Sequence, residues 1–154
     1  MPTHNESRIL PYTAQQMFDL VADIKSYPEF LPWCNKARII RHERSSEQGD
    51  EPDMMIAELV IGYKLIRERY TSRVILDHKN KTIQVSYISG PLKALRNEWR
   101  FTPDKKKSCK VDFFVQFEFS NPFLTGLMNM FFDVAFRQMV SAFEKRAADI
   151  YGGQ

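Results

Sequence analysis

The sequence contains little cysteine and little glycine, and it has no long apolar run. Two cysteines and six glycines in 154 residues exclude a disulfide-stapled scaffold and a collagen-like chain. Cys34 and Cys109 form no Cys-x-x-Cys pair, so we expect two reduced thiols and neither a disulfide nor a zinc site. No stretch reaches the roughly 18 apolar residues that a membrane-spanning helix requires.

The start of the chain also lacks an apolar signal segment. We therefore expect a protein of a prokaryotic cytoplasm, and a peripheral position at the inner face of the bacterial membrane stays open as an alternative. Neither sign of charge dominates, since 22 basic and 19 acidic side chains leave a net charge of +3. That balance does not demand a nucleic-acid partner, but it is compatible with an anionic one.

Apolar and aromatic residues are what the sequence has in quantity. Hydrophobic residues make up 44% of the chain, with twelve phenylalanines and six tyrosines, which excludes intrinsic disorder and predicts a sizeable core. The length favours one domain. We expect it to span residues 1–154, with a core over about residues 4–151.

The order of segments predicts an α+β domain. Residues 8–10 indicate a short first strand, Thr13 is suited to cap a short helix, and a second helical turn is expected at residues 27–31. From residue 37 to residue 119, apolar and polar side chains alternate with turn-like breaks, which indicates antiparallel strands with one buried face. Phe114 is the one exception in the last strand.

A long C-terminal helix follows, with Asn121 as its N-cap and Pro122 at its first position. It runs to Tyr151, a length of about 45 Å. One line of side chains on it is apolar and is expected to face the core: Leu124, Met128, Phe131, Ala135, Met139 and Ala142. The first half is apolar well beyond that line, at Phe123, Leu127, Met130, Phe132 and Phe136.

These elements pack best as a curved sheet wrapped around the long helix. A strongly curved sheet and a straight helix cannot stay equally close along their whole length, so a cavity is expected where side chains are small, as at Ala135. The alternative is that the aromatic side chains fill this space completely.

Two segments are more specific than the periodicity: residues 25–34, KSYPEFLPWC, and residues 89–101, SGPLKALRNEWRF. Together with Ser72-Arg73-Val74 and the phenylalanine-rich last strand, they closely resemble the coenzyme-Q-binding START-like family, which is grouped with polyketide cyclases and dehydrases. The resemblance implies a helix-grip fold with short helices after the first strand, and an apolar tunnel that holds a polyprenyl quinone or another lipid. Bacterial members are also described as ribosome-association toxins that interfere with subunit joining.

Within this resemblance, we select ligand-binding candidates from the inward face of the strands, the short helical segment and the long helix. Asn97 is the one amide among them, and if buried it either ties down a backbone carbonyl or donates to a ligand oxygen such as a quinone carbonyl. The indole N–H of Trp99 also needs a partner if buried. The candidates are Leu31, Trp33, Tyr63, Tyr70, Asn97, Trp99, Phe117, Phe131 and Ala135.

Two surface segments are candidates for contact with larger partners. A proline-stiffened stretch could form a lid that dips into a membrane together with Lys93, or could staple the short helix to the core; its apolar members are Tyr27, Phe30, Leu31 and Trp33. An outward row could contact RNA or lipid headgroups, or be an ordinary exposed face; it comprises Arg67, Arg69, Arg73, Arg96 and Arg100.

Catalysis finds less support in the sequence. No Ser-His-Asp or Cys-His arrangement, phosphate-binding loop or metal-ligand spacing is present, so we expect no catalytic residue, no metal and no cofactor other than the lipid ligand. Glu68 is the one acid of inward parity, and it is either a buried acid suited to a cyclase or a rim residue paired with an arginine.

Three functions follow from these observations. The first is non-enzymatic binding of a ubiquinone-like polyprenyl lipid, in support of quinone biosynthesis or delivery to the respiratory chain. The alternatives are a ribosome-associated regulator or toxin that interferes with subunit association, and a polyketide cyclase or aromatase-like enzyme. The oligomeric state stays open.

Overall fold

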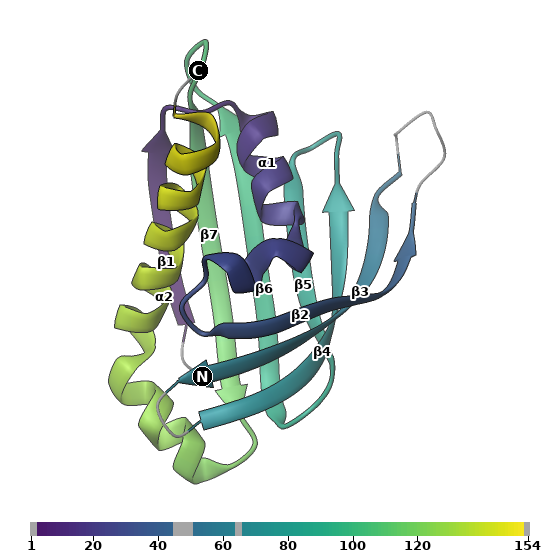
Figure 1. The fold of residues 1–154 in the computed structure, drawn as a ribbon, viewed down its shortest axis with the longest axis vertical. Helices are drawn as coiled ribbons and strands as arrows, with labels where there is room; N and C mark the ends of the chain where they lie inside the picture. Colours follow the sequence, from purple (N-terminus) through teal and green to yellow (C-terminus); the bar gives the residue numbers. More distant parts are fainter. Residues whose placement is uncertain (1–2, 45–50, 64–65, 153–154) are drawn as a thin grey trace.

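The computed structural model describes residues 3–44, 51–63 and 66–152, without the side chain of Tyr63. Seven antiparallel strands form one sheet in the order β1-β7-β6-β5-β4-β3-β2, with two α-helices and one 3₁₀ helix (Figure 1). The elements in chain order are β1 (Thr3–Leu10), α1 (Ala14–Ala22), η1 (Ile24–Glu29), β2 (Cys34–Glu43), β3 (Asp53–Tyr63), β4 (Ile66–Asp77), β5 (Thr82–Ser89), β6 (Leu92–Pro103), β7 (Cys109–Phe119) and α2 (Pro122–Tyr151).

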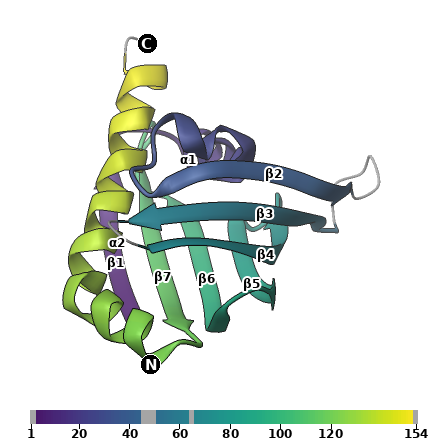
Figure 2. The ribbon, with the colours of Figure 1, turned by 60° about the horizontal axis from the view of Figure 1, so that its bottom comes forward.

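The sheet is strongly curved, and its concave side faces α2 (Figure 2). Two register shifts in the pairing of β2 with β3, between Cys34 and Lys36 and between Ile39 and Arg41, bend that edge of the sheet. At the β5–β6 turn, Gly90 has φ +135°, and a Cβ there would lie 2.9 Å from the backbone oxygen of Arg69. Glycine is therefore required where this turn packs against β4. The predicted helix-grip α+β fold is confirmed.

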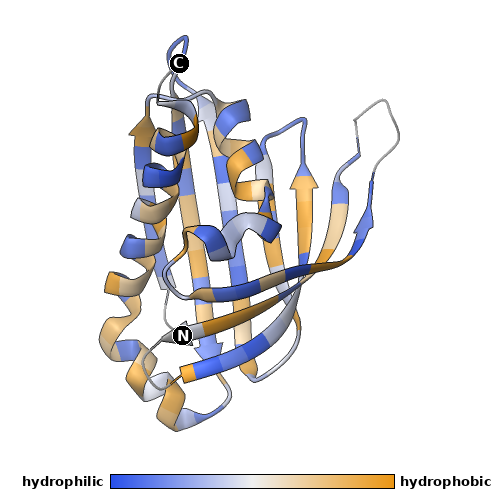
Figure 3. Cartoon of the chain, in the orientation of Figure 1, coloured by the Kyte–Doolittle hydropathy of each residue, from blue (hydrophilic) through white to orange (hydrophobic). Residues whose placement is uncertain are grey.

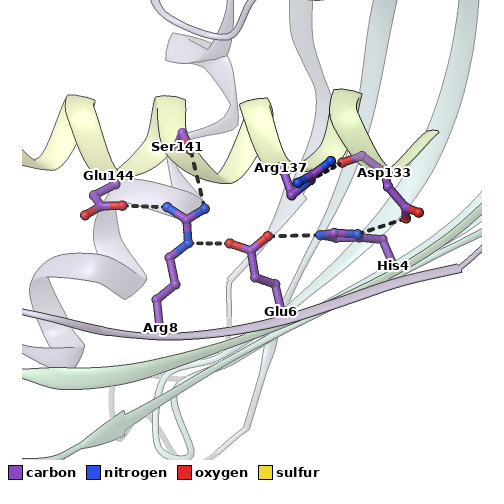
Figure 4. A network of polar contacts seen from close by, with 7 residues as sticks. All are labelled: His4, Glu6, Arg8, Asp133, Arg137, Ser141 and Glu144. Atoms are coloured by element: carbon purple, nitrogen blue, oxygen red, sulfur yellow. Dashed lines mark hydrogen bonds and ion pairs between the residues drawn. The ribbon is translucent and has the colours of Figure 1, made fainter. Parts of the chain in front are cut away.

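The first strand is longer than predicted, because β1 begins at Thr3 and pairs with β7 along its whole length. Its inward side chains are polar, which hid it from a pattern search for apolar alternation. His4 lies 3.0 Å from the Glu6 carboxylate and 3.2 Å from that of Asp133 on α2. Arg8 pairs with Glu6 and, at 2.6 Å, with Glu144 on α2 (Figure 4). Polar contacts and ion pairs therefore replace apolar packing between this strand and the part of α2 from Asp133 to Glu144.

The helix starts follow from their capping residues. The Thr13 hydroxyl accepts from the N–H of Gln16, whose side chain accepts from the Thr13 N–H, which completes a capping box for α1. Asn121 accepts from the N–H of Phe123 at 2.8 Å, with Pro122 at the first position of α2. Both caps were predicted. The second short helix lies at residues 24–29, about one turn earlier than the predicted 27–31.

The long helix packs mainly against α1, β1 and β7. Its buried side chains are Phe132, Ala135, Val140, Phe143 and Ala147, so its inner face is rotated away from the predicted line toward Phe132 and Phe143. Phe131, which was predicted to face inward, is half-buried. Within the described part of the chain, no helix combines the length and the hydropathy needed to cross a bilayer.

Candidate ligand-binding cavity

A cavity lies between the concave side of the sheet and α2, and the η1 segment contributes to its wall. The space open to the centre of a water-sized sphere is about 150 Å³. Since one water needs about 10–15 Å³ by this measure, the cavity has room for about ten water molecules, or roughly 300 Å³ of liquid. That volume falls at the lower end of small-molecule sites. The prediction that helix and sheet leave a cavity therefore holds.

Most of the predicted ligand-binding residues meet in this cavity. Tyr63 has its side chain outside the described residues. Phe131 is not among the lining residues, because α2 is rotated so that Phe136 and Phe143 face the cavity. The other seven line the cavity: Leu31, Trp33, Tyr70, Asn97, Trp99, Phe117 and Ala135.

Several lining residues were not selected from the sequence. On the strands, Ala57, Leu59 and Ile61 line the cavity and share the apolar parity of β3, so the alternation was sufficient to find them. Phe143 could not be found in that way, because its place depends on the rotation of α2 against the sheet. It contacts Trp99 edge-on, with ring centroids 5.1 Å apart.

Asn97 has the structural role that was one of its two predicted alternatives. Its Nδ2 donates to the backbone oxygen of Phe114 at 2.8 Å, and its Oδ1 accepts from the indole Nε1 of Trp99 at 3.1 Å. The amide therefore supplies the partner that the buried indole needs. It fixes Trp99 as one wall of the cavity, where Trp99 also stacks on Phe101.

The polar groups of the cavity wall are neutral. Burial raises the pKa of the Tyr70 hydroxyl well above its usual range, and it raises the pKa of the Cys34 thiol to about 11. Both groups are therefore protonated at neutral pH and can donate a hydrogen bond. Ser72, at 1% exposure, is a further lining residue that carries a hydroxyl. No lining residue in the described part of the chain carries a charge.

The predicted lid segment packs inward. The Tyr27 hydroxyl donates to the backbone oxygen of Val21, and the rings of Tyr27 and Phe30 both meet Phe143 edge-on at 5.3 and 5.2 Å. The guanidinium of Arg146 on α2 lies 5.1 Å from the Phe30 ring centroid. Tyr27, Leu31 and Trp33 line the cavity, whereas Phe30 does not. The segment therefore staples η1 to α2 and closes one side of the cavity.

The five predicted arginines lie on the outer, convex face of the sheet and are exposed. Arg73 pairs in register with Ser86, and Ser86 with Arg96, so two arginines flank one serine in a cross-strand row. The Arg96 guanidinium also lies 5.3 Å from the Phe114 ring centroid. This cation–π contact explains why an outward phenylalanine interrupts the alternation of β7. The other three arginines of this face are Arg67, Arg69 and Arg100, and Lys93 is exposed at the start of β6.

Groups suited to acid–base chemistry lie outside the cavity. Glu68 is half-buried and is not among the lining residues. His4 belongs to the network of Figure 4, and His42 and His78 lie 3.6 and 2.9 Å from the carboxylate of Asp53. Among the described residues, no group of three or more histidine, cysteine or acidic side chains is placed to hold a metal ion.

Comparison with known proteins agrees with this geometry. Residues 10–144 match the family model described as polyketide cyclase / dehydrase and lipid transport. The ribosome association toxin RatA of Rickettsia prowazekii is 41% identical, over 97% of this chain and 99% of its own. The coenzyme Q-binding protein COQ10 homolog B of Xenopus laevis is 35% identical, over 98% of this chain and 60% of its own.

Solved structures show the same fold. An 18 kDa protein from Caulobacter crescentus is 32% identical with a TM-score of 0.79, and each chain is covered to 99%. The Zhui aromatase/cyclase from Streptomyces, at 14% identity and a TM-score of 0.75, covers 95% of this chain and 93% of its own, and it shows the fold alone. With a family match across most of its length and a cavity between its sheet and its long helix, this chain belongs to the polyketide cyclase / dehydrase and lipid transport family.

Proposed function

We propose that this protein binds a ubiquinone-like polyprenyl lipid as a carrier, in support of quinone biosynthesis or delivery to the respiratory chain. The observation that supports this is the wall of the cavity, whose described residues are uncharged and almost all apolar. The name of the Xenopus laevis relative, a coenzyme Q-binding protein, points to the same ligand.

A quinone ring suits the polar groups of this wall. Its carbonyl oxygens accept hydrogen bonds, and Tyr70 and Ser72 are neutral hydroxyl donors on neighbouring positions of one face of β4. The rest of the ring and the first tail units are apolar. Burying about 200 Å² of apolar area contributes about 5 kcal/mol before the loss of ligand freedom is subtracted.

The residues of the cavity wall favour binding of the ligand without chemical change. Cyclisation or dehydration requires a group that accepts or gives a proton near neutral pH. The described wall contains no histidine, aspartate or glutamate, and the raised pKa values of Tyr70 and Cys34 make both groups poor proton donors there.

The test is native mass spectrometry, with organic extraction, of protein purified without detergent from a ubiquinone-producing host. We expect a quinone bound at one per chain. The Ala135→Trp variant should lose it, because Ala135 lines the cavity, whereas Ala148→Trp, at an exposed position on the same helix, should keep it. A wild-type protein that is empty and also fails to take up added quinone would refute the proposal.

A second candidate function is binding to ribosomal RNA through the arginine face. Two observations favour it: the register that places Arg73 and Arg96 on either side of Ser86, and the name of the Rickettsia prowazekii relative, a ribosome association toxin. Phosphate groups are the natural partners of exposed guanidinium groups. Glu58 and Glu98 partly neutralise this face, since they lie 3.9 Å from Arg69 and 3.1 Å from Arg96.

Ribosome co-sedimentation at several salt concentrations tests this candidate. Reversal of Arg69 and Arg73 to glutamate should weaken the association and lower its logarithmic salt slope by about 2, or about 1 per lost phosphate contact. Lys145→Glu is the matched control, because it changes an exposed charge on α2. Equal co-sedimentation of the double variant and the wild type would exclude this function for the arginine face.

A further inference from the structure

The outer face of α2 changes character halfway along the helix. Phe123 and Met130 are each 72% exposed and Val134 is 44% exposed, while Leu127 between them is half-buried. Positions 123, 127, 130 and 134 lie on one side of a helix, opposite the side that carries Phe132 and the rest of its core-facing residues. We call these four residues the apolar stripe.

The same face is polar further along. Gln138, Ser141 and Lys145 continue the line of the apolar stripe and are exposed, as expected for the outer face of a surface helix. No charged residue occurs between Glu118 and Asp133. Figure 3 shows this difference, with hydrophobic colours on most of the first half of α2 and more hydrophilic colours on the second half. Packing of the core therefore does not explain the apolar stripe.

The half of α2 that carries the apolar stripe also borders the cavity. Met128 lines the cavity from α2, and Ile61 and Gly62 line it from the end of β3. All three are half-buried, so the cavity wall is partly exposed between the end of β3 and the first half of α2, which lie side by side in Figure 2. A cavity with room for roughly 300 Å³ of liquid holds a ring and a short tail. This is where we expect the tail of a longer polyprenyl lipid to leave the cavity.

Exposed cations flank this part of the surface. Lys93 lies beside the start of α2, because the N–H of Ser120 donates to the backbone oxygen of Pro91 at 2.8 Å. Arg67 is exposed on β4, in register with Gly62 at the rim of the cavity. On α2, the nearest acid is Asp133, whose carboxylate is held by His4. An apolar surface flanked by cations is complementary to a bilayer that contains anionic lipids.

We propose that the apolar stripe, together with Lys93 and Arg67, docks onto an anionic lipid bilayer, and that the tail of a lipid held in the cavity stays in that bilayer. The inference rests on the proposed function, because it states where the tail of the same ligand lies. It puts the membrane contact on α2 and not on the segment of Tyr27 to Trp33, whose side chains pack inward. The bound ring would then enter and leave without exposing its tail to water.

The experiment is flotation of the full chain with vesicles of phosphatidylcholine alone or with about 30% phosphatidylglycerol. We expect binding to the anionic vesicles. Met130→Lys should weaken it about ten-fold or more, because a charge enters the apolar stripe. Ile40→Lys is the matched control, since Ile40 is 50% exposed on β2 and lies away from α2. Lys93→Glu should weaken binding to anionic vesicles only.

A parallel titration with a short-tailed, water-soluble quinone separates this inference from the proposed function. Quenching of tryptophan fluorescence reports the cavity, because Trp33 and Trp99 both line it. We expect Met130→Lys to bind the soluble quinone as the wild type does. Quinone binding without vesicle binding would overturn the docking surface alone, whereas vesicle binding without quinone binding would overturn the proposed function.

The remaining outcomes also decide the question. Equal vesicle binding by Met130→Lys, Ile40→Lys and the wild type would refute the apolar stripe as the docking surface. A further outcome is that the wild type does not bind vesicles and that sedimentation shows a dimer, which the Met130→Lys substitution dissociates. The apolar stripe would then be an interface between two copies of this chain, and the bilayer proposal would be wrong.

Discussion

Ala135→Trp is the most direct test of the cavity, since Ala135 is 6% exposed and projects from α2 into the space between helix and sheet. A buried aromatic side chain covers about 150–250 Å². Placed in the cavity, it would displace ligand contacts of similar area, which are worth about 4–6 kcal/mol at 25 cal/mol per Å². Area-based values are upper limits, so we expect the affinity for a quinone to fall about 100-fold or more.

The fold should survive this change. Overpacking costs about 1–3 kcal/mol when the neighbours must move, and the free space of about 150 Å³ lowers that cost here. Urea unfolding measures the stability. The affinity is measured by quinone titration, with the bound quinone quantified after organic extraction, because the added tryptophan would alter a fluorescence signal. Ala148→Trp should change neither quantity appreciably. A folded Ala135→Trp protein that binds quinone as tightly as the wild type would show that the ligand does not occupy this cavity.

Three further predictions concern stability. Asn97→Ala should lower the unfolding free energy by about 2–4 kcal/mol in urea titrations, because it removes the acceptor of the Trp99 indole and a donor to the Phe114 backbone oxygen; a loss below 1 kcal/mol would contradict this role. Burial raises the pKa of both Cys34 and Cys109 to about 11, from an ordinary value of 9.0. The neutral thiols therefore stabilise the fold fully below about pH 9, and urea midpoints should fall from there to about pH 11, less steeply in Cys109→Ala. Arg8→Ala should cost about 1–3 kcal/mol in thermal unfolding, because it removes one of the two partners of the largely buried Glu6 carboxylate and the ion pair with Glu144, and unchanged stability would show that the ion pairs of Arg8 in Figure 4 contribute nothing.

The fold could be predicted largely because its signals are local. The caps Thr13 and Asn121 and the period-two strands each depend on a few neighbouring residues. The start of β1 could not be predicted, because His4, Glu6 and Arg8 face α2 as polar groups. Their pairing with residues about 130 positions away leaves no local pattern.

The cavity was predictable on the strands and not on the helix. A strand offers only two faces, so the parity of Tyr70, Asn97 and Phe117 fixed their direction. A half-helix that is apolar on all sides can pack at any rotation about its axis. The sequence therefore did not distinguish Phe131 from Phe132 as the core residue, because the rotation of α2 is set by its packing against the sheet. The apolar stripe has the same origin: its residues looked like additional core because the sequence does not say which side of α2 the sheet leaves uncovered.

The pairing of β1 with β7 joins the first strand of the fold to the last. Leu10 meets Cys109, and His4 meets Val115, across about 100 residues of intervening chain. During synthesis β1 therefore remains unpaired until β7, the last strand of the sheet, has left the ribosome. Contacts between distant parts of a chain close slowly. Since β7 and α2, the last two elements of the chain, both line the cavity, a nascent chain truncated before them lacks part of the wall that would hold a lipid.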